Sequence, residues 1–185
     1  MNETLALIAS RRSHRAYKNR QITEEQLNAL LKAAVESPSA VNRQPWHFSA
    51  VQKAELLDEL NASVRENVMK KDPASRSPRF ADEAFHVFYH APTVIFISAN
   101  PENGWAAIDC GIAVQNIALA AESMGLGSVI LGMPREAFQT EKAPAFRAAL
   151  GFPEGYDFVI GIAVGHPADD KEAHPVGDNK ISMIR

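Results

Sequence analysis

The sequence predicts a single globular domain in which helices cover a central β-sheet. Its 185 residues are 46% hydrophobic, which is enough to bury one core. Strand-like and helix-like segments alternate along the chain, and residues 93–98 form a continuous apolar run rich in β-branched residues. By itself, this alternation indicates an α/β domain with a parallel, doubly wound sheet.

The first part of the chain carries clear helix and strand signals. Residues 23–26 (Thr-Glu-Glu-Gln) form a capping box, in which the threonine side chain can accept a first-turn backbone amide and the glutamine side chain can reach back to the amide of the threonine. The hydrophobic residues that follow at helical spacing, before Pro38 ends the helix, are Leu27, Leu30, Leu31, Ala34 and Val35. We expect a short strand at residues 48–51, a helix at residues 54–67 and a loop at residues 72–79.

The middle of the chain is the most apolar part. Residues 93–98 are predicted to be the central strand, and residues 105–124 a long helix, with Gly125 suited to the left-handed position after its last turn. Four polar residues interrupt this helix and favour burial by protein over a membrane span: Asp109, Gln115, Asn116 and Glu122. Because a helix that is apolar nearly all round needs cover on every side, we expect a second copy of the chain to supply some of it.

The last part of the chain is predicted to add two strands and an arm. The strands lie at residues 128–131 and 158–164, with a partly helical stretch, residues 136–150, between them. A Gly-His-Pro turn then leads the chain out of the core. The polar segment that follows ends in an apolar tail, residues 181–184, which could close on its own sheet or cross to a partner subunit.

Composition narrows the class of function. The net charge of −3 and the pI near 6.1 argue against a general nucleic-acid surface. The first residues lack the pattern of a signal peptide, so a cytoplasmic location without a membrane partner is expected. Cys110 is the only cysteine, which excludes an internal disulfide, a CxxC pair and a Cys-rich zinc site, and its apolar neighbours predict a buried side chain. We expect residues 1–185 to form one domain with an arm from about residue 166.

A basic segment, residues 11–15 (Arg-Arg-Ser-His-Arg), predicts an anion site. Arginine presents a planar fork of donors that matches two phosphate oxygens, and several forks on a short segment can surround a terminal phosphate. A cofactor that carries a monophosphate is the first candidate ligand. The alternative is a solvated basic turn whose arginines pair with nearby Glu or Asp.

A polar loop forms the second motif. Residues 37–48 contain two prolines that restrict the backbone, while Ser39, Asn42 and Gln44 supply short polar groups. Such groups can address the carbonyls and ring nitrogens of a flat heterocycle. The alternative is an ordinary connection between a helix and a strand.

These motifs together resemble the FMN-dependent nitroreductase and flavin reductase family. Residues 11–17 match its Arg-Arg-Ser-x-Arg-x-aromatic motif, and residues 38–48 match Pro-Ser-Ala-x-Asn-x-Gln-Pro-Trp-x-Phe without a departure. Three further matches follow in the family's order, at residues 88–98, 121–128 and 165–167. The resemblance covers essentially the whole chain.

The resemblance implies a role for each matched segment. The FMN phosphate would be held by Arg11, Arg12, Ser13 and Arg15. The flavin ring would be met, from the partner subunit, by Pro38, Ser39, Ala40, Asn42 and Gln44. The strand end formed by Ile130, Leu131 and Gly132 would lie along the ring. There the backbone amide of Leu131 or Gly132 would donate a hydrogen bond to the ring nitrogen that receives hydride. Lys180 in the arm would close over the phosphate, with Arg185 as its rival.

The resemblance also implies a fold and an activity. The fold is α+β, with a mixed, largely antiparallel sheet flanked by helices, in a homodimer with a domain-swapped C-terminal arm and FMN at the interface. The activity is transfer of hydride from NADH or NADPH to FMN and then reduction of small flat acceptors (nitroaromatics, quinones or flavins) by a ping-pong mechanism, with the cofactor carrying the chemistry. The alternatives are a flavin-binding storage or sensor module without turnover, and a specialised relative such as a reductive dehalogenase. The aromatic residues that either line the substrate face or pack in the core are Phe80, Phe85, Phe88 and Trp105.

Other catalytic and binding motifs fail on inspection. The glycines at residues 125–127 precede a strand, and the next one, Gly132, comes too late for a dinucleotide-binding turn. His86 and His90 have helical spacing but lack both the glutamate of a zinc protease and a third ligand, so no metal site is predicted. No Gly-x-Ser-x-Gly or Ser-x-x-Lys motif offers an activated nucleophile.

Overall fold

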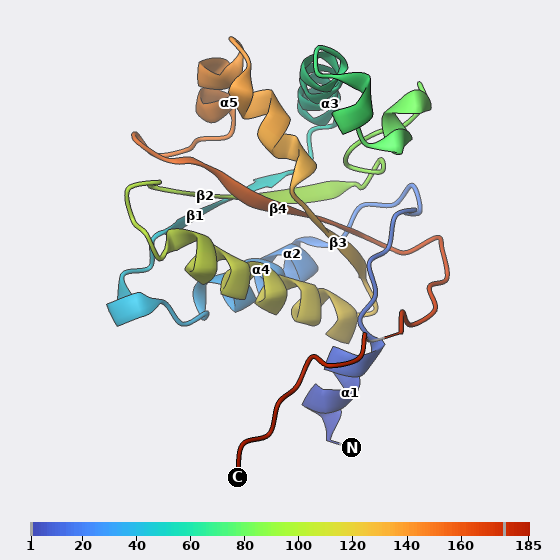
Figure 1. Cartoon of the computed structure of the whole chain (residues 1–185), viewed down its shortest axis with the longest axis vertical. Helices are drawn as coiled ribbons and strands as arrows, with labels where there is room; N and C mark the ends of the chain where they lie inside the picture. The colour runs from blue at the N-terminus through green and yellow to red at the C-terminus, as the bar shows by residue number, and fades with distance from the viewer. Residues whose placement is uncertain (1, 176) are drawn as a thin grey trace.

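The computed structural model describes residues 2–175 and 177–185, and within them a β-sheet lies between two groups of helices (Figure 1). The strands of this sheet, in their spatial order, are β1 (Trp46–Val51), β2 (Thr93–Ala99), β4 (Asp157–Gly165) and β3 (Gly127–Leu131). Each strand extends its predicted range by only one or two residues at an end. All seven residues of β2 are buried, which confirms that it is a central strand.

The directions of the strands differ from what alternation alone indicates. All three neighbouring strand pairs are antiparallel, so the parallel, doubly wound sheet is wrong and the largely antiparallel sheet implied by the resemblance is confirmed. The reason is the position of β4. Strands β2 and β3, which flank helix α4 (Ala106–Ser123) in the sequence, run in the same direction, but β4 is inserted between them. A strand-helix-strand pattern therefore does not make its two strands neighbours.

Helices α2 (Glu24–Val35) and α4 cover one face of the sheet (Figure 1). The predicted capping box begins α2, since the backbone amide of Gln26 donates to Thr23 Oγ1 at 3.1 Å and that of Thr23 to Gln26 Oε1 at 2.9 Å. Fully buried side chains from both helices and from the sheet fill this layer, among them Leu30, Ile95, Ile117 and Ile162. Cys110 is buried in the same cluster, as predicted, and burial together with the neighbouring Asp109 charge raises the pKa of its thiol to about 12.

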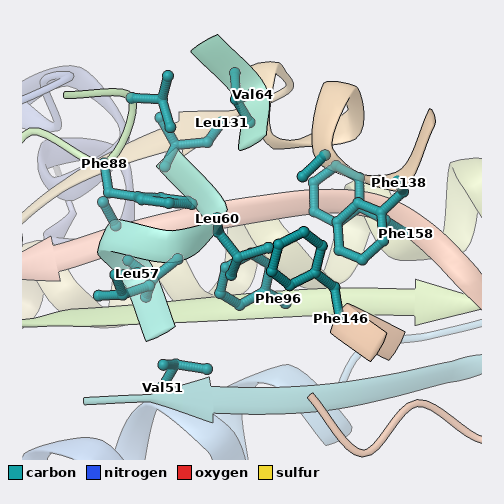
Figure 2. Packing of buried hydrophobic residues seen from close by; sticks show 14 of the residues in the cluster. Val51, Leu57, Leu60, Val64, Phe88, Phe96, Leu131, Phe138, Phe146 and Phe158 are labelled. Atoms are coloured by element: carbon teal, nitrogen blue, oxygen red, sulfur yellow. The ribbon is translucent and has the colours of Figure 1, made fainter. Parts of the chain in front are cut away.

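The opposite face is covered by α3 (Ala54–Met69), α5 (Ala143–Ala149) and a 3-10 segment, η4 (Met133–Gln139). Leu57, Leu60 and Val64 of α3 belong to the buried cluster that this helix forms with the sheet (Figure 2). Phenylalanine rings fill the other half of this layer, where Phe138 stacks on Phe158 with 5.1 Å between ring centroids. The predicted loop at residues 72–79 contains only short 3-10 turns, η2 (Pro73–Ser75) and the start of η3 (Pro78–Ala81).

Two segments lie outside the three layers. Helix α1 (Glu3–Ser10) has no buried residue and projects beyond the end of α4 (Figure 1). The arm after residue 167 forms no helix or strand at its described positions, and Ile181, Met183 and Ile184 are 84%, 77% and 98% exposed. Closure of the tail on its own sheet is therefore wrong, and its crossing to a partner stays a prediction. Among the described residues, no helix is both long and apolar enough to cross a lipid bilayer.

Candidate functional site

The basic segment lies against the outer edge of β3. The backbone amide of His14 donates to the carbonyl of Ser128 at 3.0 Å, and Ser13 forms a parallel bridge with Ser128. This contact needs a glycine beside it, because a Cβ at Gly127 would lie 2.9 Å from two side-chain atoms of His14. The Gly-x-Gly that failed as a dinucleotide motif therefore has a structural role, which is to let the basic segment approach the sheet.

The arginines of this segment carry donors without acceptors. Arg12 Nη1 donates to the carbonyls of Ala9 at 2.7 Å and Arg11 at 3.0 Å, so part of this guanidinium caps the C-terminal end of α1. The Nε atoms of Arg12 and Arg15 are buried and have no hydrogen-bond partner among the described residues. Within the same part of the chain none of the segment's arginines pairs with a carboxylate, so the alternative of a paired basic turn is wrong. Buried, unpaired cationic donors suit a bound anion.

A pocket of about 500 Å³ borders these arginines. Its walls are the last turn of α1, four residues of the basic segment and residues 171–174 of the arm. The pocket therefore joins three segments that are far apart in the sequence. Sequence reasoning did not single out Lys171 or His174, because neither residue lies in a recognisable motif.

Asp169 holds the arm against the basic segment. Its carboxylate accepts the backbone amide of Arg15 at 2.9 Å, lies 2.8 Å from His14 Nδ1 and pairs with Lys171 Nζ at 3.2 Å. Burial alone would raise the pKa of Asp169, but these donors outweigh it and lower the pKa to about 2. Asp169 was not predicted either, since its partners at residues 14 and 15 are more than 150 positions away.

The outer edge of β3 beyond the basic segment is available to a ligand. In a strand, backbone groups point alternately to the two sides. Because Ser128 directs its carbonyl outward to His14, Ile130 also faces the outer edge, whereas Leu131 faces β4, where it is paired with Gly161. The amide of Gly132 shares a peptide plane with the Leu131 carbonyl and points the opposite way, toward the outer edge. Of the two predicted amides, the geometry thus favours Gly132 over Leu131. A Cβ at Gly132 would meet nothing within 4 Å among the described residues, which leaves room for a planar group.

The 38–44 loop lies at the other end of α4. It contains a short 3-10 turn, η1 (Ala40–Asn42), and the backbone amide of Ala40 donates to Asp109 Oδ1 in the first turn of α4 at 3.2 Å. The basic segment instead contacts β3 just after the last turn of α4 (Figure 1). Helix α4 has 18 residues and is about 27 Å long. One chain therefore does not bring the two predicted halves of the site together.

Comparison with known proteins agrees with this geometry. The family model described as "Nitroreductase family" matches residues 8–166. A crystal structure of a nitroreductase with bound FMN from Desulfitobacterium hafniense superposes with a TM-score of 0.95, at 37% identity and full coverage of both chains. This chain belongs to the nitroreductase family.

Two further relatives extend the comparison. An FMN-bound nitroreductase structure from Bacteroides fragilis has a TM-score of 0.92 and 32% identity over all of both chains. A protein from Archaeoglobus fulgidus, provisionally named NADH dehydrogenase/NAD(P)H nitroreductase, is 36% identical over 179 residues, which are 96% of this chain and 93% of its own length. The likeness thus extends over the whole chain in both sequence and structure.

Not every residue implied by the family resemblance lies at the pocket. Lys180 and Arg185 are on the exposed arm and do not line it, whereas Lys171 does. Of the aromatic candidates, Phe80 and Phe88 are buried in the core and Phe85 packs against it, while Trp105 is exposed at the start of α4. Only Trp105 therefore remains a candidate for a ligand or subunit surface.

The histidine pair of this nitroreductase-family chain is a structural element. Phe88 donates its backbone amide to His86 Nδ1 at 3.2 Å, so the neutral ring carries its proton on Nε2, 3.2 Å from Asp58 Oδ1. Burial and the neighbouring His90 lower the pKa of His86, which favours this neutral form. Across the described ranges, no group of three or more His, Cys, Asp or Glu side chains is arranged to hold a metal ion.

Proposed function

We propose that this protein is an FMN-dependent oxidoreductase that takes hydride from NADH or NADPH and reduces small flat acceptors such as nitroaromatics, quinones or flavins. The observation that carries the proposal is that the Nε donors of Arg12 and Arg15, beside the outer edge of β3, are buried and have no partner in the described structure. A dianionic phosphate satisfies such donors, and an edge strand offers backbone groups to a ring. The names of the relatives supply the cofactor and the electron donor.

Each segment then has a defined task toward the cofactor. Arg11, Arg12, Ser13 and Arg15 would bind the phosphate, and Ile130 to Gly132 would lie along the ring, with the Gly132 amide toward its reactive nitrogen. Bound FMN supplies the acceptance of hydride and the later donation of electrons. The chain orients the ring and limits the access of water. No described side chain of the site is needed as a catalytic acid or base.

The loop that completes the ring site would come from a second copy of the chain. Trp105, just before α4, is 58% exposed, and Ile108 and Ile112 of α4 are 55% and 38% exposed; together they form an apolar stripe that a neighbour would cover. A two-fold axis near the middle of α4 would place this stripe against the second half of the other α4 and would pair the first turn of one helix with the last turn of the other. That arrangement brings the 38–44 loop of one subunit to the basic segment and β3 edge of the other. The exposed tail, residues 181–184, would add to the same interface.

A test of this function uses the purified dimer. Its cofactor should be released by denaturation and identified as FMN, the bound flavin should bleach when NADH or NADPH is added without oxygen, and a quinone or nitroaromatic should restore its colour. Double-reciprocal plots of initial rate against donor concentration, at several fixed acceptor concentrations, should be parallel, because donor and acceptor use one ring face in turn. Bound flavin that neither pyridine nucleotide reduces would instead identify a storage or sensor module. Reduction of a halogenated substrate alone, with loss of halide, would identify a dehalogenase.

A further inference from the structure

Helix α4 carries two polar side chains that fasten the 38–44 loop and the residue before it. Asp109, which is 3% exposed, accepts the Ala40 amide through Oδ1 at 3.2 Å. Asn116 donates from Nδ2 to Ser37 Oγ at 2.8 Å, and Ser37 is itself buried. The two side chains are seven residues apart, so they lie on one face of the helix, two turns from each other. These residues interrupt the apolar pattern of the helix, and the loop accounts for both of them.

The loop held in this way has a strained backbone. Val41, Asn42 and Gln44 have φ angles of 46°, 54° and 46°, in the left-handed region that non-glycine residues avoid. Such a conformation is unfavourable and persists only where its surroundings impose it. Inside the loop, Gln44 donates from its backbone to Ser39 Oγ at 2.9 Å and from Nε2 to Asn42 Oδ1 at 3.0 Å. Val41 is 84% exposed, so packing above the loop within the chain does not impose this conformation.

The carboxylate of Asp109 is itself an expensive group to bury. Its Oδ2 atom is buried without a hydrogen-bond partner in the described part of the chain. An unpartnered buried acceptor destabilises the fold, and the positive end of α4 offsets only part of that cost. An apolar side chain at this position would avoid the cost and suit the surrounding cluster, but it could not hold the Ala40 amide. The anchoring of the loop is the compensating gain that the geometry shows.

We propose that Asp109, assisted by Asn116, is a positioning residue that sets the shape of the 38–44 loop and thereby the surroundings of the flavin ring in the partner subunit. This role rests on the proposed function, because it needs a ring beneath the loop. Asp109 acts through the loop and does not touch the cofactor. Since α4 also carries the exposed apolar stripe, the same helix links subunit contact to the geometry at the ring.

The test compares Asp109→Ala and Asp109→Asn with wild type in the flavin-loaded dimer. Asp109→Ala should weaken the binding of FMN and of riboflavin by the same factor, about tenfold, because the ring contacts are lost and the phosphate contacts are kept. The visible absorbance and circular dichroism of the bound flavin should shift. Asp109→Asn retains a carbonyl oxygen for the Ala40 amide and should recover most of both properties. In the flavin-free protein, hydrogen exchange of the amide of Ala40 should accelerate in Asp109→Ala.

The matched control is Cys110→Ala, which removes a neighbouring buried side chain of α4 that forms no hydrogen bond to the loop. It should lower stability without changing the flavin spectrum. The positioning role alone would be overturned if Asp109→Ala kept the wild-type flavin spectrum, the wild-type affinities for FMN and riboflavin, and the wild-type exchange rate of the Ala40 amide. A spectral change of equal size in Cys110→Ala would also overturn it. A wild type that binds no flavin would overturn the proposed function together with this role.

Discussion

The side chain of Arg15 illustrates how one residue can point to a ligand. Its Nη1 atom lies 3.5 Å from the Ser13 carbonyl, which is a weak contact, and its Nε atom has no partner among the described residues. Arg12 differs, because its Nη1 atom already caps α1. The two arginines share a motif, but only Arg12 has a clear contact with the fold. Arg15 is therefore the cleaner probe of the anion site.

Arg15→Ala should weaken FMN binding about ten- to a hundredfold, because a charge-assisted hydrogen bond is worth roughly 1.5–3 kcal/mol. Binding of riboflavin, which has the ring without the phosphate, should change little. Arg12→Ala should weaken FMN binding as well and also lower the melting temperature, since the end of α1 loses its cap. Titration calorimetry with both ligands checks this. Equal losses for FMN and riboflavin in Arg15→Ala would assign Arg15 to the ring or to the fold.

Asp169 should make stability depend on pH in the acid range. Its pKa is lowered from 3.8 to about 2 in the folded state, so its contribution is fully present above about pH 4 and is lost as the pH falls toward 2. At pH 6, Asp169→Asn should lower the free energy of unfolding by on the order of 2 kcal/mol. Urea titrations of both proteins between pH 2 and pH 6 measure the difference. If the difference in free energy of unfolding between the two proteins stays constant across this range, the ionised Asp169 carboxylate does not stabilise the fold.

At the scale of elements, close backbone approach decides where the site forms. The basic segment reaches β3 because Gly127 leaves space for His14, and the segment after it pairs with the chain beyond β4, as Lys18 donates to the His166 carbonyl at 2.8 Å. Gly165 has the same role on the neighbouring strand, where a Cβ would lie 2.7 Å from Pro92. Two glycines thus allow loops to pack directly on strand ends.

Gly127→Ala should destabilise the protein by about 1–3 kcal/mol, because the added methyl group overlaps His14 and cannot be relieved without moving the basic segment. FMN affinity should fall with stability, since the arginines move with the segment. Gly104→Ala is the matched control, as a Cβ there meets nothing within 4 Å in the described structure. Thermal melts with and without FMN measure both effects. A Gly127→Ala protein with full affinity would separate the anion site from β3.

At the scale of the whole molecule, the site is incomplete in one chain. The basic segment and the 38–44 loop lie at opposite ends of α4, and Ile108 and Ile112 are exposed on the first half of this helix. The tail, residues 181–184, is likewise apolar and exposed. The proposed dimer would explain these features together, because it would cover the stripe and join the two halves of the site.

Ile108→Asp should convert the dimer to a monomer, because it puts a charge at the centre of the exposed stripe of α4. FMN should be lost in parallel, since the loop no longer reaches the ring. Met69→Asp, at an exposed apolar residue of α3 in the other helical layer, should change neither property. Sedimentation equilibrium with detection at a flavin absorption wavelength measures both the oligomeric state and the amount of bound FMN. A monomeric Ile108→Asp protein with full FMN occupancy would refute the shared site.

Removal of the residues after Gly177 tests the arm. We expect weaker retention of flavin and a less stable dimer, because the proposed contacts of the apolar tail on the partner would be lost. Dilution of the truncated protein, followed by size-exclusion chromatography, measures both. If both properties are unchanged, the tail has no part in the interface, and Lys171 of the pocket wall becomes the arm's only candidate for the phosphate among the described lysines.

The sequence by itself determined the elements and the two motifs. Capping residues, helical spacing and β-branched runs act over about a dozen residues, so α2, α3, α4 and the four strands could be predicted with small errors at their ends. The arginines and the polar loop were likewise readable, because their chemistry resides in consecutive side chains.

Only the tertiary structure decided how these parts meet. The insertion of β4 between β2 and β3 set the strand directions, and the length of α4 separated the two motifs. Asp109 contacts Ala40, which is 69 positions away, and Asp169 contacts His14, which is 155 positions away. Lys171 reaches the pocket because its neighbour Asp169 makes this contact. Local sequence encodes the conformation of a segment, whereas the pairing of distant segments depends on which packing of all of them buries the core, and no single motif contains that information.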